Sequence, residues 1–135
     1  MINHFGELVI WQISKDLYVK LYRLLENSRD YAFKDQLLRA TLSISNNIAE
    51  GFGRGGKREF LYFLRIAKGS CNEVESMLYI LKELSKIDEK TIEELRSDLK
   101  DVIHKTSAMM NGIIKKIEEE SQTSEHSNKQ KPKRK

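Results

Sequence analysis

Seven apolar residues recur between positions 60 and 81 at alternating steps of four and three. They are Phe60, Leu64, Ala67, Cys71, Val74, Leu78 and Leu81. This spacing places all of them on one stripe of an α-helix, in the pattern of knobs-into-holes packing. Such a stripe is buried only when other helices cover it, so the sequence predicts a helix from about Lys57 to Ser85 inside a helical bundle.

A second seam of the same kind begins at residue 92. Its members are Ile92, Leu95, Leu99, Val102, Thr106, Met109, Ile113 and Ile117. Asp88 is the expected N-cap of this helix, and Glu89 adds negative charge to the first turn, where the helix dipole favours it. The seam predicts a helix that begins next to residue 88 and continues to about residue 120.

Two further amphipathic segments come earlier in the chain. The first helix is expected from about Glu7 to Glu26 and the second from about Phe33 to Gly51. No stretch alternates for long with the period of two that a half-buried strand requires. Four long helices joined by short connections favour an antiparallel up-down-up-down bundle. We therefore predict an all-α fold in which residues 1–120 form a four-helix bundle.

The formal charge of +4 lies at one end of the chain. Residues 121–135 contain five basic residues and one acidic residue, so residues 1–120 are neutral. Within them, residues 1–68 carry an excess of base and residues 69–120 an excess of acid. From Ser121 onward no large apolar side chain occurs, and the sequence predicts a disordered basic tail over residues 121–135.

The glycine-rich stretch GFGRGGK, residues 51–57, fits two phosphate-binding patterns. Both patterns need a β-strand that enters the glycines, whereas here a helix enters them. Arg58 also stands where the second pattern requires Ser or Thr as a magnesium ligand. We interpret the stretch as a turn between antiparallel helices, because glycine adopts the left-handed conformations that end a helix.

Other classes of function receive little support. The one cysteine, Cys71, excludes an internal disulfide framework and suits a reducing cytosol, so a cytoplasmic location is expected. No apolar run approaches the length of a membrane span. His4, His104 and His126 are scattered, and no metal, cofactor or catalytic grouping can be argued from them. The sequence favours a protein that is not an enzyme, with Cys71 as a buried, inert thiol.

The block QLLRATLSISNNIAEG, from Gln36 to Gly51, resembles the signature of the four-helix-bundle proteins encoded in intervening sequences of bacterial 23S ribosomal RNA genes. Further matching positions are Ile10-Trp11-Gln12, Glu59-Phe60, Ile66-Ala67, Gly69-Ser70 and Glu73. The resemblance covers about residues 5–118. It implies a four-helix bundle that assembles as a homopentameric ring.

The resemblance also extends to the accessory protein of diversity-generating retroelements, which works with a reverse transcriptase and nucleic acid. Most members of the family have no known biochemical function. The accessory protein is strongly basic, whereas residues 1–120 of this chain are neutral.

A row of polar residues lies along the second predicted helix, opposite its apolar face. Its members are Gln36, Arg39, Ser43, Asn47, Glu50 and Arg54. The row is either an ordinary solvated face or a hydrogen-bonded network at a helix or subunit interface. In the second case a buried Glu50 would require a cationic partner such as Arg54 or Arg65.

Cations with an interleaved aromatic residue follow the glycine turn, a pattern that suits phosphate contacts and base stacking. They are Arg54, Lys57, Arg58, Tyr62, Arg65 and Lys68. The tail adds cations that could neutralise phosphates without sequence specificity. These are Lys129, Lys131, Lys133, Arg134 and Lys135. The alternatives are a solvated face that pairs with neighbouring acids, and a tail that only aids solubility.

Apolar residues outside the main stripes indicate a second contact surface, and hence a homo-oligomer. They are Ile10, Ile13, Leu17, Leu61 and Met77. The leading hypothesis is a homo-oligomeric scaffold or accessory protein, a homopentamer by resemblance, that associates with RNA or DNA. The alternative is an assembly that binds a protein partner and has no nucleic-acid role.

Overall fold

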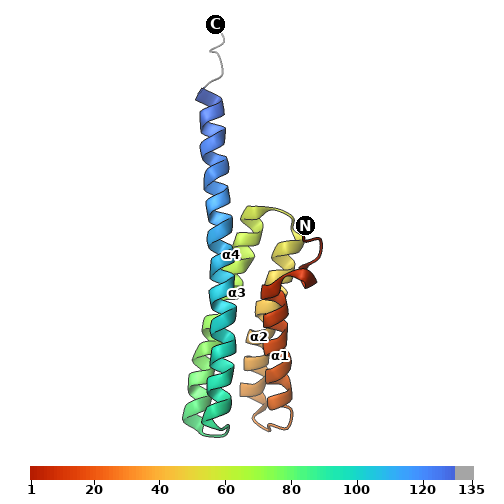
Figure 1. Cartoon of the computed structure of the whole chain (residues 1–135). Coiled ribbons are helices and arrows are strands. Elements are labelled where there is room, and N and C mark those ends of the chain that lie inside the picture. Colours follow the sequence, from red (N-terminus) through yellow and green to blue (C-terminus); the bar gives the residue numbers. More distant parts are fainter. Residues whose placement is uncertain (130–135) are drawn as a thin grey trace.

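The computed structural model describes residues 1–129, which form four α-helices preceded by one short 3-10 helix. The elements are η1 (Phe5–Glu7), α1 (Val9–Leu24), α2 (Tyr31–Gly53), α3 (Lys57–Leu84) and α4 (Glu89–Lys129). Successive helices run in opposite directions, as Figure 1 shows. The described residues contain no strand, so the predicted all-α, up-down-up-down bundle is confirmed.

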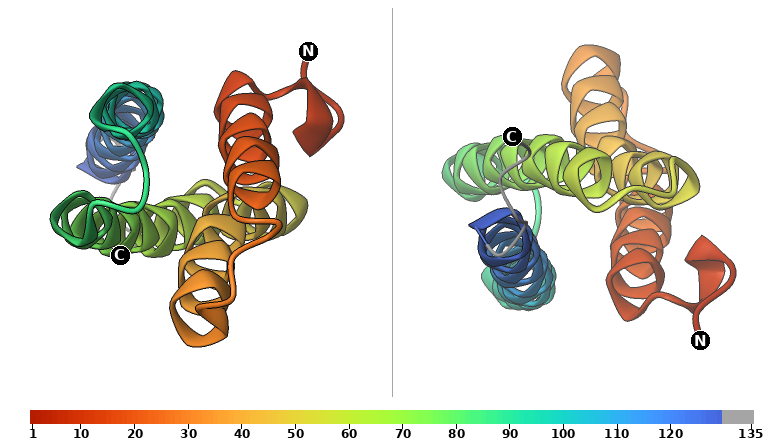
Figure 2. Two further views of the ribbon diagram at one scale, coloured as in Figure 1. Left: turned by 90° about the horizontal axis from the view of Figure 1, so that it is seen from below. Right: turned by 90° about the horizontal axis from the view of Figure 1, so that it is seen from above.

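Viewed along the bundle, α3 lies obliquely, with its first residues beside the end of α2 and its last residues beside the start of α4 (Figure 2). Each helix packs against its neighbours in the sequence, and α1 closes the bundle by contacting α4. The α2–α3 contact is the most extensive and the α1–α4 contact the least extensive of these four. The α1–α4 contact is the smallest because these two helices are not consecutive in the chain, whereas short connections hold the other pairs together as antiparallel neighbours.

The two predicted seams form the centre of the core. Leu64, Val74 and Leu78 of α3 are fully buried, and so are Ile92 and Leu95 of α4. The helices α1 and α2 complete the same apolar cluster with Leu17, Leu21, Leu37, Ile44 and Ile48. One continuous core of this kind is what holds an amphipathic bundle together, because each helix alone would expose its apolar face to water.

Side-chain caps fix where two of the helices begin. Asp30 precedes α2 and accepts a hydrogen bond from the Phe33 backbone N–H at 3.4 Å. The expected cap at Asp88 is confirmed, since its carboxylate accepts from the Thr91 backbone N–H at 3.0 Å and from the Thr91 hydroxyl at 2.7 Å. The bond from the Thr91 hydroxyl, followed by that from the backbone, lowers the pKa of Asp88.

The predicted start of disorder at Ser121 is wrong, because α4 continues as a helix to Lys129. Residues 121–128 are exposed, and this part of α4 extends beyond the other helices (Figure 1). A helix that already exists is lengthened at little cost, since the unfavourable nucleation step is complete. The absence of apolar side chains therefore predicted exposure but did not predict loss of helix. The tail cations Lys131, Lys133, Arg134 and Lys135 lie outside the described residues.

Candidate functional site

The glycine turn joins two helices, as predicted. Gly55 has a φ of 86°, a left-handed conformation that glycine adopts without steric cost. Gly51 has a different role: a Cβ atom at this position would lie 2.6 Å from the Phe63 Cβ atom of α3. The close approach of α2 to α3 therefore requires glycine at residue 51. No strand enters the turn, so the geometry on which both phosphate-binding patterns depend does not exist here.

The polar row of α2 lies beside α3, and hydrogen bonds connect the two helices. The Gln36 side-chain amide donates to the Glu73 carboxylate at 2.6 Å. The Ser70 hydroxyl donates to the Ser43 hydroxyl oxygen at 2.9 Å, and the Asn47 amide donates to the same oxygen, also at 2.9 Å. The Gln36–Glu73 and Ser43–Ser70 bonds tie the two helices, whereas the Asn47 bond lies within α2.

Glu50 and Arg54 lie at the end of the row nearest the glycine turn. Their ion pair has an N–O distance of 2.7 Å, and each side chain is 52% exposed. The Arg54 guanidinium also lies 5.4 Å from the centre of the Phe63 ring. Arg54 is thus the cation that Glu50 pairs with, but the pair is on the surface of the single chain. Arg39 is exposed and has no ion pair within residues 1–129.

An exposed apolar stripe on α3 accompanies this row. Ile66, Ile80 and Leu84 are 37%, 48% and 47% exposed. Helical spacing places them on the same face as Glu73, the partner of Gln36. We call this surface the α2–α3 face. It comprises the polar row of Gln36, Arg39, Ser43, Asn47, Glu50 and Arg54, together with Ile66, Ile80 and Leu84.

The apolar residues that were expected to form a second surface are different ones. Ile10, Leu17, Leu61 and Met77 are all buried inside the single chain, and Ile13 is partly buried against the core. That prediction is wrong because every helix of the bundle packs against two neighbours, so it buries a wider arc than one stripe. The exposed stripe could have been found in the sequence, since Ile66, Ile80 and Leu84 recur at helical steps outside the seam.

The basic row comprises Arg58, Tyr62, Arg65 and Lys68 on α3. Arg58 and Arg65 are exposed, and Tyr62 lies between them along the helix and is 59% exposed. Within the part of the chain that the structure describes, none of the row's cations has an ion pair. The adjacent cations differ, because Arg54 pairs with Glu50 and Lys57 with Glu120 of α4. The row therefore holds three cations that remain available to an external anion.

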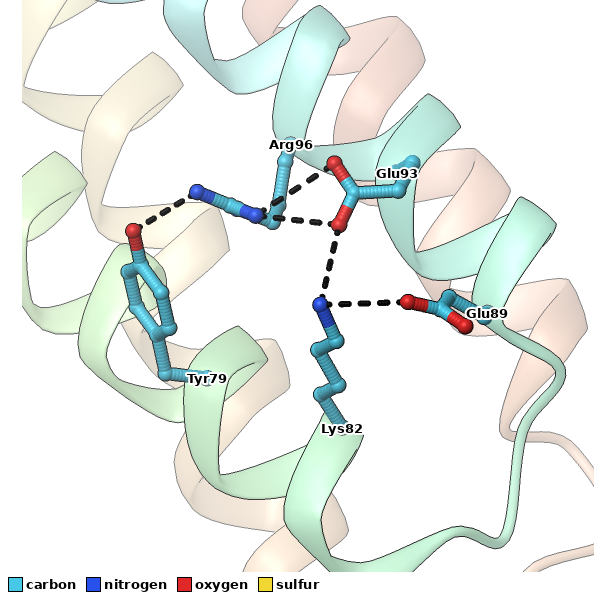
Figure 3. A network of polar contacts seen from close by, with 5 residues as sticks. All are labelled: Tyr79, Lys82, Glu89, Glu93 and Arg96. Carbon is cyan, nitrogen blue, oxygen red and sulfur yellow. Dashed lines mark hydrogen bonds and ion pairs between the residues drawn. The ribbon is translucent and has the colours of Figure 1, made fainter.

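A polar network that the sequence analysis did not predict joins α3 to α4 (Figure 3). Arg96 donates to the Tyr79 hydroxyl at 2.6 Å and lies 3.0 Å from the Glu93 carboxylate. Lys82 pairs with Glu89 at 3.3 Å and with Glu93 at 3.5 Å. Hydrogen bonding raises the pKa of Lys82, chiefly through Glu89, and lowers the pKa of Glu93, chiefly through Arg96. Each charge has a partner, so the network serves as a tie between helices.

Cys71 is fully buried in the α3 seam, as predicted. Burial raises the pKa of its thiol to about 12, so the thiol stays protonated and unreactive at neutral pH. Among residues 1–129 no cluster of His, Cys, Asp and Glu side chains has the size of a metal site. No described helix has the length and apolar character that a membrane span requires.

Comparison with known proteins identifies the group to which this architecture belongs. A solved structure from Bacteroides thetaiotaomicron, described as a protein of unknown function from the S23 ribosomal protein family, is similar with a TM-score of 0.71. The two chains are 23% identical over 76% of this chain and 98% of the other, a likeness that shows the fold alone. The curated proteins contain no match. The family model described as 23S rRNA-intervening sequence protein matches residues 6–111, so the chain belongs to that family.

Proposed function

We propose that the protein is a homo-oligomeric scaffold that associates with RNA or DNA, with its copies meeting through the α2–α3 face. The observation that carries the proposal is the basic row, where three cations that form no ion pair within residues 1–129 flank an exposed Tyr62 on one helix. Guanidinium groups neutralise phosphates, and an exposed aromatic ring stacks on an unpaired base. Neither interaction requires a particular sequence, so we expect binding with low sequence specificity.

The α2–α3 face supports the assembly. Its apolar stripe would be covered by a second copy, and the polar row beside it offers hydrogen-bonding groups around that apolar centre, the usual anatomy of a protein interface. A ring of five copies is our proposal from the family resemblance. Assembly would repeat the basic row in every copy, so weak individual interactions would become multivalent. A relation to the accessory protein of diversity-generating retroelements belongs to the same proposal.

The experiment for nucleic acid is a salt titration. Anisotropy with labelled single-stranded RNA and DNA should show binding that weakens as salt rises. The triple variant Arg58→Gln, Arg65→Gln, Lys68→Gln should weaken binding at least fivefold and lower the salt slope by about one unit for each phosphate that is no longer neutralised. The matched control is Lys90→Gln, Lys100→Gln, Lys116→Gln, which removes the same charge from exposed positions of α4. Equal weakening in both variants would contradict a role for the basic row.

A second measurement tests the interface. Light scattering coupled to size exclusion gives the mass of the particle, and Ile80→Glu should reduce it by placing a charge within the apolar stripe. Val9→Glu is the control, because Val9 is 53% exposed on α1, outside the α2–α3 face. A particle that survives Ile80→Glu, or one disrupted equally by Val9→Glu, would show that the copies meet elsewhere.

The alternative function, a scaffold for a protein partner, is favoured by the neutral charge of residues 1–120. A neutral surface attracts nucleic acid weakly. In addition, two cations next to the basic row already form ion pairs, Arg54 with Glu50 and Lys57 with Glu120. If the assembled protein binds no nucleic acid even at low salt, a surface outside the α2–α3 face would instead recruit a protein.

A further inference from the structure

The α1–α2 and α3–α4 connections lie at the end of the bundle opposite the glycine turn (Figure 1). Residues of both connections line a concave site of about 350 Å³. Its volume falls within the range of small-molecule sites. The lining is mainly apolar in area and comes from α1, α2 and α3 and from the α1–α2 and α3–α4 connections. The apolar residues are Leu24, Leu25, Phe33, Leu81, Leu84 and Ile87.

The floor and the walls of this site differ in exposure. Leu25 and Leu81 form the buried floor, at 5% and 4% exposed. Leu24 and Leu84 line the walls and are 38% and 47% exposed. An apolar molecule in the site would cover these two leucine side chains, and removal of apolar surface from water is favourable in proportion to its area.

Cations surround the opening of the site. Arg29, Lys34 and Lys86 line it, against one acidic residue, Asp30. The Asp30 carboxylate is already engaged as the cap of α2. The Lys34 ammonium donates to the Glu26 carbonyl at 3.3 Å, whereas Arg29 and Lys86 have no ion pair within residues 1–129.

Three cations against one acid give the lining of the site a net positive charge. An excess of cations around an apolar hollow therefore selects for a molecule with an apolar body and an anionic head. Such a molecule would cover the leucine walls and meet the free cations at the same time, in the manner of specific ligand sites that combine an apolar lining with a few placed polar groups.

We propose that this site binds a small amphipathic carboxylate, with its hydrocarbon body against Leu24 and Leu84 and its carboxylate between Arg29 and Lys86. Arg29 supplies the planar donor geometry that suits a carboxylate, and Lys86 adds a point charge. This binding does not depend on nucleic acid, because the site lies at the far end of the bundle from the glycine turn that precedes the basic row. Leu84 also belongs to the α2–α3 face, so this one side chain is shared between the site and the proposed contact of copies.

Titration calorimetry with dodecanoate, below its micelle concentration, tests the proposal on the full chain. We expect saturable binding of one molecule per chain, with a Kd on the order of 10–100 µM for a small partly open site. Dodecyltrimethylammonium, which has the same chain and the opposite head charge, should bind at least tenfold more weakly. Equal binding of the two compounds would overturn the assignment, because it would show that only the hydrocarbon is recognised.

A pair of charge variants locates the carboxylate. Arg29→Gln with Lys86→Gln should weaken dodecanoate binding at least fivefold, and among residues 1–129 neither residue has an ion pair whose removal would disturb the fold. Lys115→Gln with Lys116→Gln removes the same charge from exposed positions of α4, distant from the site, and should leave the Kd unchanged. Equal weakening in both variants, or no saturable binding to the unmodified protein, would refute the site.

Discussion

The α2–α3 and α3–α4 interfaces share one helix but are held together differently. Between α2 and α3 the backbones approach closely at Gly51, and small hydroxyl groups such as Ser43 and Ser70 bond across the interface. Between α3 and α4 the apolar seams pack against each other. At the solvent-facing margin of this interface, long charged side chains such as Lys82 and Arg96 bond from one helix to the other. The first interface depends on steric fit, whereas the margin of the second depends on charges that salt and pH can weaken.

The largest expected effect disrupts the steric fit. Gly51→Ala places a methyl group 2.6 Å from the Phe63 Cβ atom, so the helices must separate, at a cost of about 1–3 kcal/mol in the free energy of unfolding. Chemical denaturation followed by circular dichroism measures this cost. Gly53→Ala is the matched control, because a Cβ atom there meets nothing within 4 Å, and alanine should be neutral or slightly stabilising. If both variants are destabilised equally, the close approach at Gly51 has no special role.

A smaller effect is expected from two buried threonines, one in α2 and one in α4. Thr41 of α2 and Thr106 of α4 are both fully buried, but the Thr41 hydroxyl donates to the Leu37 carbonyl at 2.7 Å while the Thr106 hydroxyl has no partner within the described residues. Thr106→Val should therefore stabilise the protein by about 1 kcal/mol, since it removes an unsatisfied polar group without a change of shape. Thr41→Val should stabilise less or destabilise. Equal midpoints for the two variants in thermal or denaturant unfolding would contradict this difference.

The smallest effect concerns the charged margin of α3–α4. Glu93→Gln should lower the unfolding midpoint slightly, and the effect should weaken at high salt because Glu93 is exposed and neither Lys82 nor Arg96 is buried. The pKa of Glu93 is lowered from 4.5 in the folded state, so its contribution is present above the unfolded pKa and disappears as pH falls through the folded value. The difference between the unmodified protein and Glu93→Gln should therefore shrink below about pH 4.5. A difference that persists in acid or in high salt would indicate a packing role for Glu93.

The same α3–α4 network predicts how stability changes at alkaline pH. The pKa of Lys82 is raised above 10.5 by its bonds to Glu89 and Glu93, so its contribution is complete below the unfolded pKa and is lost as pH rises through the folded value. Lys82→Gln should thus match the unmodified protein only at strongly alkaline pH. Unfolding midpoints measured from neutral to alkaline pH provide the comparison, and a constant difference would indicate that charge is not involved.

The helices and the core were predictable because they depend on local spacing. The apolar steps of three and four predicted the buried seams that contain Leu64 and Leu95. Asp88, a residue type common at helix N-caps, was predicted to cap α4 and does so. The end of α4 was not predicted, because helix propagation past Ser121 needs no apolar packing. For the candidate sites, the polar row and the basic row were found from spacing, but their proposed roles stay predictions.

By itself the sequence determined an all-α bundle. Each helix carries a regular apolar stripe, and that stripe is removed from water when it packs against the stripes of the other helices. Only the tertiary structure decided which of the other apolar residues stay exposed. Leu61 and Met77, which were expected on a second surface, are buried, whereas Ile66 and Ile80 are exposed. It also decided which cations are already neutralised, as Lys57 is by the distant Glu120. The physical reason is that burial and ion pairing depend on neighbours from other helices, and helical periodicity describes only the face of a residue within its own helix.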